Sequence, residues 1–178
     1  MKKICTTIIT LYFLFQTCSN STGHDSYPEF LFEISYENYA WGYQLSGRYI
    51  DSDGIVFFYD YSNNEYNYWT PEDRDNPTRI ELIEKYSKQN EKLRQISTHD
   101  VDYYYQLFSL LPNAKYTDTV HTGCDMGIIQ FIAYYYSEEN DTYTKRVLKQ
   151  YGDLSFQDTL YFLQKITSWL DSTLANVN

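Results

Sequence analysis

Apolar and polar positions alternate with a period of two over residues 30–61, which predicts β-strands. Phe30 and Phe32 take every second position of a first run, and two longer runs follow on either side of Asp53 and Gly54. Successive strand side chains point to opposite faces, so each run predicts one strand. The Asp53-Gly54 pair supplies the left-handed backbone that a tight hairpin turn needs. We therefore expect three consecutive antiparallel strands that end near residue 61.

Apolar residues recur at spacings of three and four in three later segments, which predicts helices. The first begins at Pro77 with Asn76 as its cap, the second is capped by Thr98, and the third has a capping-box-like start at Ser155–Asp158. The apolar positions of the three helices are Ile80, Ile83 and Tyr86; Val101, Tyr104, Tyr105, Phe108 and Leu111; and Phe156, Leu160, Leu163, Ile166, Trp169, Leu170 and Leu174. The last stripe is so regular that we expect core packing and not a cofactor face.

The remaining segments decide the fold class. Residues 126–137 are apolar on both faces, which predicts a central strand, and residues 142–151 alternate like a half-exposed strand. Residues 89–97 are polar, with Leu93 and Ile96 able to continue a helical stripe. The order of three strands, two helices, two strands and one helix predicts an α+β fold. We expect an antiparallel sheet of about five strands (three, then two) packed by about three helices.

The N-terminal segment predicts export. Two lysines precede Ile4–Phe15, a largely apolar run of twelve residues. Such a run is too short to span a membrane but fits the hydrophobic region of a secretory signal peptide. We expect residues 1–17 to be a leader, residues 18–28 a flexible tether, and residues 29–178 a single globular α+β domain.

The stretch Phe15-Gln16-Thr17-Cys18 resembles the end of bacterial lipoprotein signal peptides, in which a cysteine directly follows the apolar run. It departs from the usual pattern of that family, which has small residues just before the cysteine. The resemblance implies that Cys18 is acylated, with palmitate among the attached chains, and becomes the mature N-terminus. It therefore implies an exported protein held on a membrane of the cell envelope by its lipid.

The body also resembles small bacterial lipoproteins whose activity is unknown. The resemblance lies in Ala40-Trp41-Gly42-Tyr43, the turn at residues 51–54, Leu148–Asp153 and Trp169-Leu170. It implies a location in the envelope and brings no activity, substrate or cofactor with it.

The cysteines leave one alternative open. Cys5 would be removed with the leader, and if Cys18 carries lipid then Cys124 has no cysteine partner. If another peptidase cleaves nearby and Cys18 keeps its thiol, a disulfide between Cys18 and Cys124 is possible in the oxidising envelope.

The charge of the chain argues against two kinds of partner. There are 14 basic and 24 acidic residues, a net charge of −10, and loss of the two leader lysines leaves 12 against 24, or −12. Lysine and arginine form no cluster, so neither nucleic acid nor an electrostatic hold on anionic lipid is expected. The 21 tyrosines have two explanations, the codon usage of an AT-rich genome or an aromatic recognition surface.

A long loop over residues 62–77 carries Tyr66, Tyr68 and Trp69. Its asparagines, prolines and run of charged residues break the strand pattern, and loops of this length are mobile or functional. Because aromatic rings are costly to leave in water, we expect these three either to fold back on the sheet or to form a binding lip.

The only local cluster of reactive residue types is His121, Cys124 and Asp125. A cysteine nucleophile needs a nearby base, but catalytic partners are usually distant in sequence and no known thiol-enzyme motif surrounds this one. A zinc site from these residues or His99 lacks paired ligand spacing. The turn at residues 51–54 lacks the later ligands of a calcium loop. We therefore expect no metal, no cofactor and no catalytic residue.

The sequence favours a lipid-anchored, non-catalytic binding module that recognises a protein, a peptide or a glycan. The alternative is a surface hydrolase that uses His121 with Cys124, or a pair of carboxylates whose separation only a structure can give. A purely structural component of the envelope is the third possibility.

Overall fold

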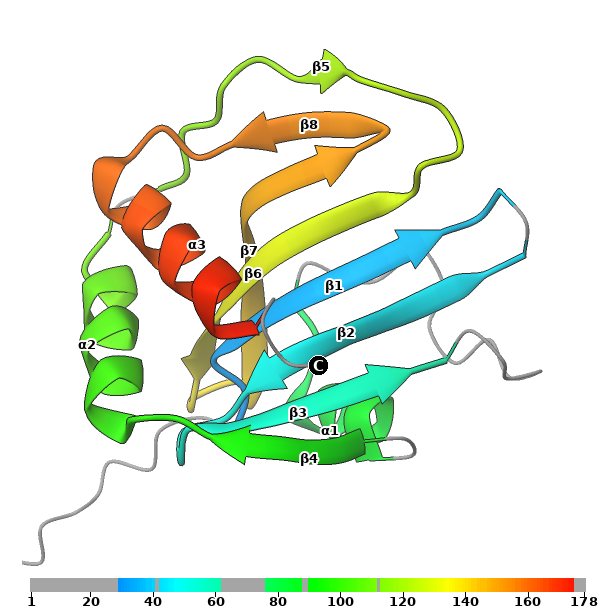
Figure 1. The fold of residues 1–178 in the computed structure, drawn as a ribbon. Helices are drawn as coiled ribbons and strands as arrows, with labels where there is room; N and C mark the ends of the chain where they lie inside the picture. Colours follow the sequence, from blue (N-terminus) through cyan, green and yellow to red (C-terminus); the bar gives the residue numbers. More distant parts are fainter. Residues whose placement is uncertain (1–28, 41, 62–75, 88–89, 112, 175–178) are drawn as a thin grey trace, which may run out of the picture.

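The computed structural model describes most of the chain from residue 29 onward, namely residues 29–40, 42–61, 76–87, 90–111 and 113–174 (Figure 1). The predicted leader and tether, Cys18, and the residues Tyr66, Tyr68 and Trp69 of the predicted loop lie outside these ranges. The described residues form one antiparallel sheet and three helices, which confirms the α+β class. The sheet has eight strands, so the expectation of about five was too low.

The strands, in chain order, are β1 (Phe32–Asn38), β2 (Gln44–Ile50), β3 (Ile55–Asp60), β4 (Asn90–Gln95), β5 (Val120–His121), β6 (Ile128–Ser137), β7 (Thr142–Gly152) and β8 (Leu154–Gln157). The helices are α1 (Arg79–Ser87), α2 (Thr98–Ser109) and α3 (Tyr161–Leu174). The strand order is β4-β3-β2-β1-β6-β7-β8-β5, which places β1 and β6 side by side at the centre. Helices α2 and α3 cover one face of the sheet, and α1 lies on the opposite face (Figure 1).

The expected hairpin is confirmed in β2 and β3, which pair from Ile50 opposite Val56 outward. Its turn is held by Asp51, whose Oδ1 accepts hydrogen bonds from the N–H groups of Asp53 (2.9 Å) and Ile55 (2.8 Å). Gly54 has φ +72°, a conformation that a side chain would strain. The carboxylate of Asp51 therefore shapes the turn by binding backbone amides.

The sequence pattern does not predict β4, β5 and β8. β4 is polar because it lies at the edge of the sheet and, in the described part of the chain, pairs with β3 alone, so most of its side chains are exposed. β8 occupies the place where the last helix is expected to begin, and α3 starts only at Tyr161. Asp158 is not part of a capping box with Ser155; its Oδ1 accepts from the Leu160 N–H at 3.0 Å and its Oδ2 from Arg146 Nη2 at 2.7 Å.

The starts of α1 and α2 differ from the prediction by one or two residues. At α1, Thr78 Oγ1 accepts from the Glu81 N–H and Glu81 Oε2 accepts from the Thr78 N–H, a capping box that replaces the expected cap at Asn76. At α2, the side chain of Ser97 accepts a backbone N–H, so Ser97 is the cap and Thr98 the first helical residue. Both corrections are a choice between neighbouring residues of similar capping ability.

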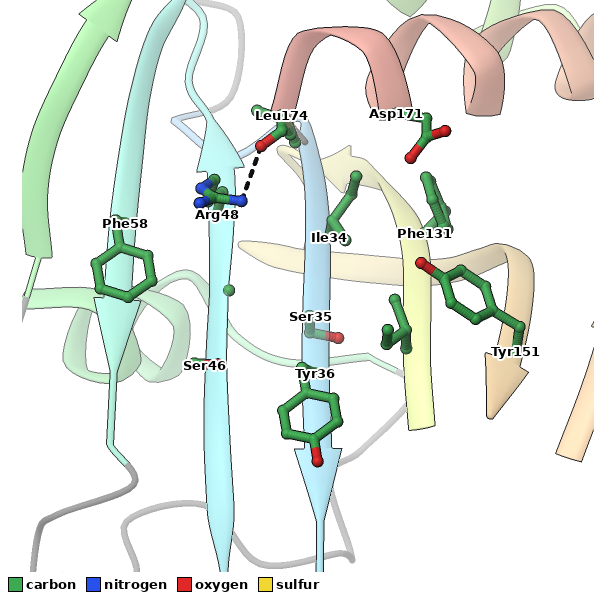
Figure 2. Close-up of a pocket in the computed structure, with 12 residues that line it drawn as sticks. Ile34, Ser35, Tyr36, Ser46, Arg48, Phe58, Phe131, Tyr151, Asp171 and Leu174 are labelled. Atoms are coloured by element: carbon green, nitrogen blue, oxygen red, sulfur yellow. Dashed lines mark hydrogen bonds between the residues drawn. The ribbon is translucent and has the colours of Figure 1, made fainter. Parts of the chain in front are cut away.

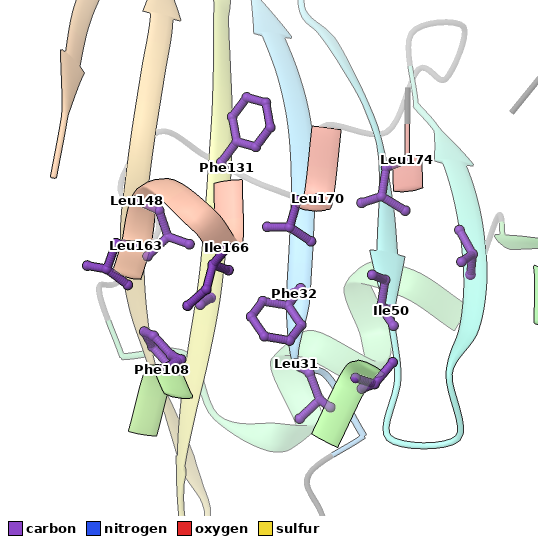
Figure 3. Packing of buried hydrophobic residues seen from close by; sticks show 13 residues of the cluster. Leu31, Phe32, Ile50, Phe108, Phe131, Leu148, Leu163, Ile166, Leu170 and Leu174 are labelled. Carbon is purple, nitrogen blue, oxygen red and sulfur yellow. The ribbon is translucent and has the colours of Figure 1, made fainter. Parts of the chain in front are cut away.

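The core between the sheet and α2 and α3 is mainly aliphatic, and we call it the aliphatic core. Figure 3 shows the leucine and isoleucine side chains of α3 directed at the central strands. Its buried members are Leu31, Phe32, Ile50, Val56, Val101, Phe108, Phe131, Ala133, Leu148, Leu163, Ile166, Leu170 and Leu174. The predicted stripe of the last helix is therefore confirmed as core packing for Leu163, Ile166, Leu170 and Leu174, whereas Phe156 lies in β8.

The core between the sheet and α1 is dominated by tyrosine, and we call it the tyrosine core. Its buried members are Phe30, Leu45, Tyr49, Tyr59, Tyr61, Leu82, Tyr86, Ile132, Tyr134 and Tyr143. Helix α1 turns Tyr86 inward as predicted, together with Leu82 and Lys85, but contrary to the prediction Ile80 and Ile83 are 64% and 37% exposed. The reason is a charged group inside this core, described below.

Candidate functional site

A groove of about 380 Å³ opens on the sheet face that carries α3, beside the last turn of that helix (Figure 2). We call it the sheet groove. Residues of five neighbouring strands, β3, β2, β1, β6 and β7, line it, and α3 borders it. Its main side chains are Ile34, Tyr36, Ser46, Arg48, Phe58, Ile129, Phe131, Tyr151, Asp171 and Leu174.

The alternation of side chains along each strand places these residues on one face of the sheet. Ile34 and Tyr36 are alternate residues of β1, and Ser46 and Arg48 are alternate residues of β2, so all four project from one face. Phe58 is the register partner of Arg48 on β3. The same face is buried under α2 and α3 farther along these strands. The groove is thus the part of this face that extends past the end of α3.

Arg48 joins the groove to the helix. Its Nη1 donates to the main-chain oxygen of Leu174 at 2.8 Å, and its guanidinium lies 5.8 Å from the ring centre of Phe58. Arg94 of β4 donates in the same way to the oxygen of Thr173. Because the last carbonyl groups of a helix form the negative end of its dipole, two cations at this end stabilise it. The end of α3, and with it one wall of the groove, is therefore fixed in place.

The opposite wall is aromatic. Lys149 Nζ lies 5.5 Å from the ring centres of both Phe131 and Tyr151. Burial first, and the negative charge of Asp171 second, raise the pKa of the Tyr151 phenol. The phenol stays protonated at neutral pH and can donate a hydrogen bond. The groove thus combines apolar surface with a guanidinium on one side and a carboxylate on the other.

This combination suits binding better than catalysis. The described lining residues include no histidine and no cysteine, and Asp171 is their single carboxylate. They therefore offer neither a thiol with its base nor a carboxylate pair. Ligand sites are usually concave, largely apolar, and supplied with a few polar groups that fix orientation, as this groove is.

His121, Cys124 and Asp125 are all exposed, in β5 and the connection that follows it. His121 is paired with Leu154 of β8, and the thiol of Cys124 has no disulfide partner among the residues that the structure describes. A neighbouring hollow of about 240 Å³ is lined by Asp125 but by neither His121 nor Cys124. Within the described ranges, no three histidine, cysteine, aspartate or glutamate side chains are placed to hold a metal ion. The structure therefore does not gather this cluster into one cavity.

The small hollow does gather carboxylates, because Glu37 and Asp153 line it together with Asp125. Asp153 Oδ1 accepts the N–H of Met126 at 2.9 Å, and Asp125 has a left-handed backbone with φ +64°. Asp153 thus has a structural role in holding the connection between β5 and β6. Among the described features, this hollow corresponds best to the carboxylate pair that the hydrolase alternative requires.

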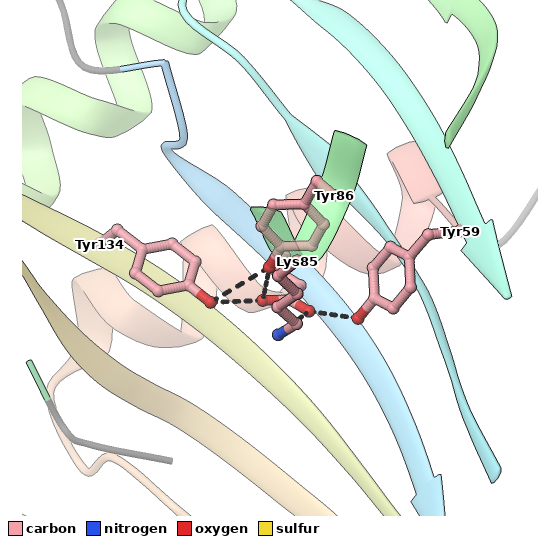
Figure 4. Close-up of polar contacts among 5 residues, drawn as sticks. Tyr59, Lys85, Tyr86 and Tyr134 are labelled. Atoms are coloured by element: carbon pink, nitrogen blue, oxygen red, sulfur yellow. Dashed lines mark hydrogen bonds and ion pairs between the residues drawn. The ribbon is translucent and has the colours of Figure 1, made fainter. Parts of the chain in front are cut away.

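A second group of polar residues lies inside the tyrosine core and was missed by sequence reasoning. Glu33 of β1 has no exposed surface, and three phenols and one ammonium group surround its carboxylate (Figure 4). Tyr59 donates to Oε1, Tyr86 donates to Oε2 at 2.7 Å, and Tyr134 also donates to Oε2. Lys85 Nζ lies 3.4 Å from Oε1. We call these five residues the Glu33 cluster.

The Glu33 carboxylate is ionised despite its burial. Burial, the largest effect, raises its pKa, but Lys85 and the three phenols together outweigh burial, so the pKa lies below its ordinary value. Burial followed by the charge of Glu33 raises the pKa of Tyr59 and Tyr86 well above the ordinary value, so both phenols remain donors. With its carboxylate closed to solvent and all donors directed inward, the cluster is structural.

Gly47 makes room for this cluster. It pairs with Tyr59 across β2 and β3, and a Cβ atom at this position would lie 2.5 Å from the Tyr59 hydroxyl oxygen and from the Ile34 carbonyl oxygen. Only glycine allows the ring of Tyr59 to cross the neighbouring strand and reach Glu33. The sequence shows a glycine within a predicted strand, but only the strand pairing shows why glycine is required there.

Of the predicted site residues, Cys18, Tyr66, Tyr68 and Trp69 lie outside the described residues, and the sheet groove contains none of the others. The groove residues come from strands far apart in sequence, so no local motif could identify them. The available signal was the apolar content of both faces of β6.

No protein-family model, curated protein or solved structure matches this chain. In the described residues, no helix combines the length and the apolar character that crossing a membrane requires.

Proposed function

We propose that this chain is an exported, lipid-anchored protein of the cell envelope that binds an extended segment of a partner polypeptide in the sheet groove, without catalysis. The observation that carries the binding role is the groove itself. It is a concave, largely apolar surface with Arg48 on one side and Asp171 on another, next to a firmly held helix end. The export and the anchor are inferred from the leader and from Cys18.

A polypeptide fits the lining better than a glycan does. Ile34, Phe131 and Leu174 present aliphatic and aromatic surface that apolar side chains would cover, and such burial drives most protein association. The guanidinium of Arg48 and the carboxylate of Asp171 in one groove favour a chain that carries both kinds of charge in a set order. The floor strands are already paired on both sides, so recognition would use side chains and not an added strand.

The anchor explains how an acidic body can stay on a membrane. Two or more acyl chains at Cys18 would hold the protein without any basic patch, at about 0.8 kcal/mol per buried methylene group. Residues 18–28 would then be the tether between the lipid and the first strand. Intact mass of the native protein tests this point: a mature chain that begins at Cys18 with added acyl mass supports it, and retention of Met1 contradicts it.

Site-specific photo-crosslinking in native envelopes tests the binding role. Tyr36, half-buried in the groove, is replaced by p-benzoylphenylalanine, and exposed Tyr116, outside the groove, is replaced in a matched control. We expect a discrete polypeptide adduct from position 36 only. The same adducts from both positions, or none from position 36, would contradict a polypeptide partner at this groove.

Filling the groove provides a second test once the adduct is identified. Ser46→Trp places a large ring over the floor, and we expect it to abolish the position 36 adduct while the melting temperature stays nearly unchanged. An unchanged adduct in a folded Ser46→Trp protein would show that the partner contacts another surface.

The hydrolase is the second candidate, and the small acidic hollow is the observation that favours it. Replacing Glu37 with Gln in one variant and Cys124 with Ala in another removes a carboxylate and the thiol without touching the sheet groove. Loss of an envelope hydrolytic activity in either variant would support this candidate. Activity equal to that of the parent protein in both variants would contradict it.

A further inference from the structure

A second groove, which we call the helix groove, runs between α2 and α3 on the side of the helices away from the sheet groove. It is wide and shallow, with a volume of about 630 Å³. Its lining is aromatic and polar: Tyr103, Tyr104, Tyr161, Gln164, Lys165, Ser168, Trp169 and Ser172. Neither the leader nor the sheet groove accounts for it.

The rings of the helix groove are held in position before any ligand arrives. Tyr104 and Trp169 are stacked with centres 4.3 Å apart and planes inclined by 19°, and Trp169 packs on buried Phe32. Tyr103 meets Tyr104 edge to face at 5.1 Å. On α3, Lys165 Nζ lies 5.0 Å from the ring centre of Tyr161. Rings that are already ordered lose little conformational entropy on binding.

Two of these rings are nevertheless open to solvent. Tyr103 is 52% exposed and Tyr161 is 64% exposed, one on each helix. An exposed tyrosine offers an electron-rich ring face and a hydroxyl group that donates and accepts hydrogen bonds. Two such rings on a rigid pair of helices form the two sides of a shallow binding surface.

The polar groups and the charge of the groove differ from those of the rest of the protein. The exposed amide of Gln164 and the hydroxyl of Ser168 follow one another along α3, next to Lys165. Among the described lining residues, Lys165 is the one charged side chain and none is a carboxylate. This contrasts with a whole chain that has 24 acidic and 14 basic residues. The groove therefore presents no negative charge of its own to a ligand.

We propose that the helix groove binds a saccharide chain of neutral or N-acetylated sugars. Sugar rings carry C–H groups with partial positive charge on their faces, which stack on the negative faces of aromatic rings, and hydroxyl groups at their edges. The exposed rings of Tyr103 and Tyr161 can stack on the faces of the sugars. Gln164, Lys165 and the phenols can form hydrogen bonds with the hydroxyl groups at the edges. An apolar helix of a partner protein would cover the rings but leave the amide and the ammonium group without partners. This proposal does not depend on the sheet groove.

Tryptophan fluorescence of the full chain tests the proposal. Trp41→Phe and Trp69→Phe leave Trp169 as the only tryptophan, so a signal change on titration reports on this groove. The probes are the tetramer of β-1,4-linked N-acetylglucosamine and cellotetraose. We expect saturable binding, and affinity lower by about tenfold in Tyr161→Ala and in Tyr103→Ala. Tyr161→Phe keeps the ring and should retain most of the affinity.

A matched control is Tyr116→Ala, which removes another exposed tyrosine, 43% accessible, outside both grooves. It should leave binding unchanged, and all three alanine variants should melt at nearly the same temperature as the parent. Absence of saturable binding for both oligosaccharides would overturn the proposal. Binding that Tyr161→Ala and Tyr103→Ala leave unaltered would also overturn it. So would an apolar helical peptide that binds more tightly than either oligosaccharide in the same titration. Loss of the photo-crosslink at position 36 would bear on the sheet groove and not on this result.

Discussion

The two faces of one sheet are buried in different ways. The aliphatic core relies on leucine, isoleucine and phenylalanine under α2 and α3, whereas the tyrosine core contains six buried tyrosines and encloses the Glu33 carboxylate under α1. Apolar burial has no direction, and its free energy scales with the area removed from water. A buried carboxylate instead requires each of its partners at a fixed place.

This difference indicates which substitutions should destabilise the fold most. In the aliphatic core, removing a methyl group costs the contacts of that group. In the tyrosine core, removing one partner leaves the others buried and unsatisfied, which costs more than the interaction itself contributed. The short helix α1 therefore carries a residue, Lys85, whose loss should matter more than that of a typical leucine.

Lys85→Met gives the largest expected effect. The substitution keeps an unbranched apolar stem but leaves the carboxylate of Glu33, with 0% exposure, without its counter-charge. We expect the free energy of unfolding to fall by about 3–5 kcal/mol, as when one member of a buried ion pair is removed. Chemical denaturation followed by circular dichroism measures it.

The matched control lies on the same helix. Arg79 pairs with Glu29 at 2.6 Å, but both side chains are nearly half exposed. Arg79→Met should therefore change stability by no more than about 0.5 kcal/mol. Equal effects of Lys85→Met and Arg79→Met would mean that Glu33 is not enclosed as described.

Leu170→Ala tests the aliphatic core and comes next in size. Leu170 is fully buried on α3 against the central strands. The loss of its contacts and the cavity left behind should lower the free energy of unfolding by about 3 kcal/mol. Combined with Lys85→Met, the two effects should add, because the residues lie on opposite faces of the sheet. A coupling well above about 0.5 kcal/mol would show that the two cores are not independent.

Acid titration separates the two cores by their chemistry. The pKa of Glu33 is lowered in the folded protein, so its contribution to stability is present above the ordinary pKa of about 4.5 and is lost as the pH falls through the folded value. The reference is the double variant Glu33→Gln/Lys85→Met, which has no charge at this site. We expect the free energy of unfolding of the parent to fall relative to that of the reference below about pH 4.5. Parallel stability curves down to strong acid would contradict the ionised state of Glu33.

How much of this could be read from the sequence differs between the cores. The regular stripe of the last helix predicts that Leu163, Ile166 and Leu170 are buried, because apolar spacing alone decides that case. The stripe of Ile80, Ile83 and Tyr86 is right for Tyr86, which is buried, and wrong for Ile80 and Ile83, because a polar residue, Lys85, is drawn inward by Glu33. Periodicity counts apolar residues and has no means of pairing two charges that are 52 residues apart.

The strands and grooves show the same limit. β6 is predicted closely because its run is apolar on both faces and β7 because its residues alternate, whereas β4 is defined by pairing with β3 and carries no apolar pattern. The sheet groove joins residues of β1, β2, β3, β6, β7 and α3, and a single sequence does not give the strand order that brings them together. The predicted N-terminal leader is the opposite case, since such a prediction rests on a local pattern and needs no tertiary contact.

The smallest effect is expected at the residue where periodicity and structure disagree. Ile80 is 64% exposed on the outer side of α1, whereas Leu82, two residues later, is 1% exposed in the tyrosine core. Ile80→Ala should change the free energy of unfolding by no more than about 0.5 kcal/mol, because alanine is also the better helix former. Leu82→Ala should cost about 2–5 kcal/mol. Denaturation of the two variants side by side determines which face of α1 is buried: a costly Ile80→Ala with a neutral Leu82→Ala would require α1 to be rotated, and would remove Lys85 from Glu33.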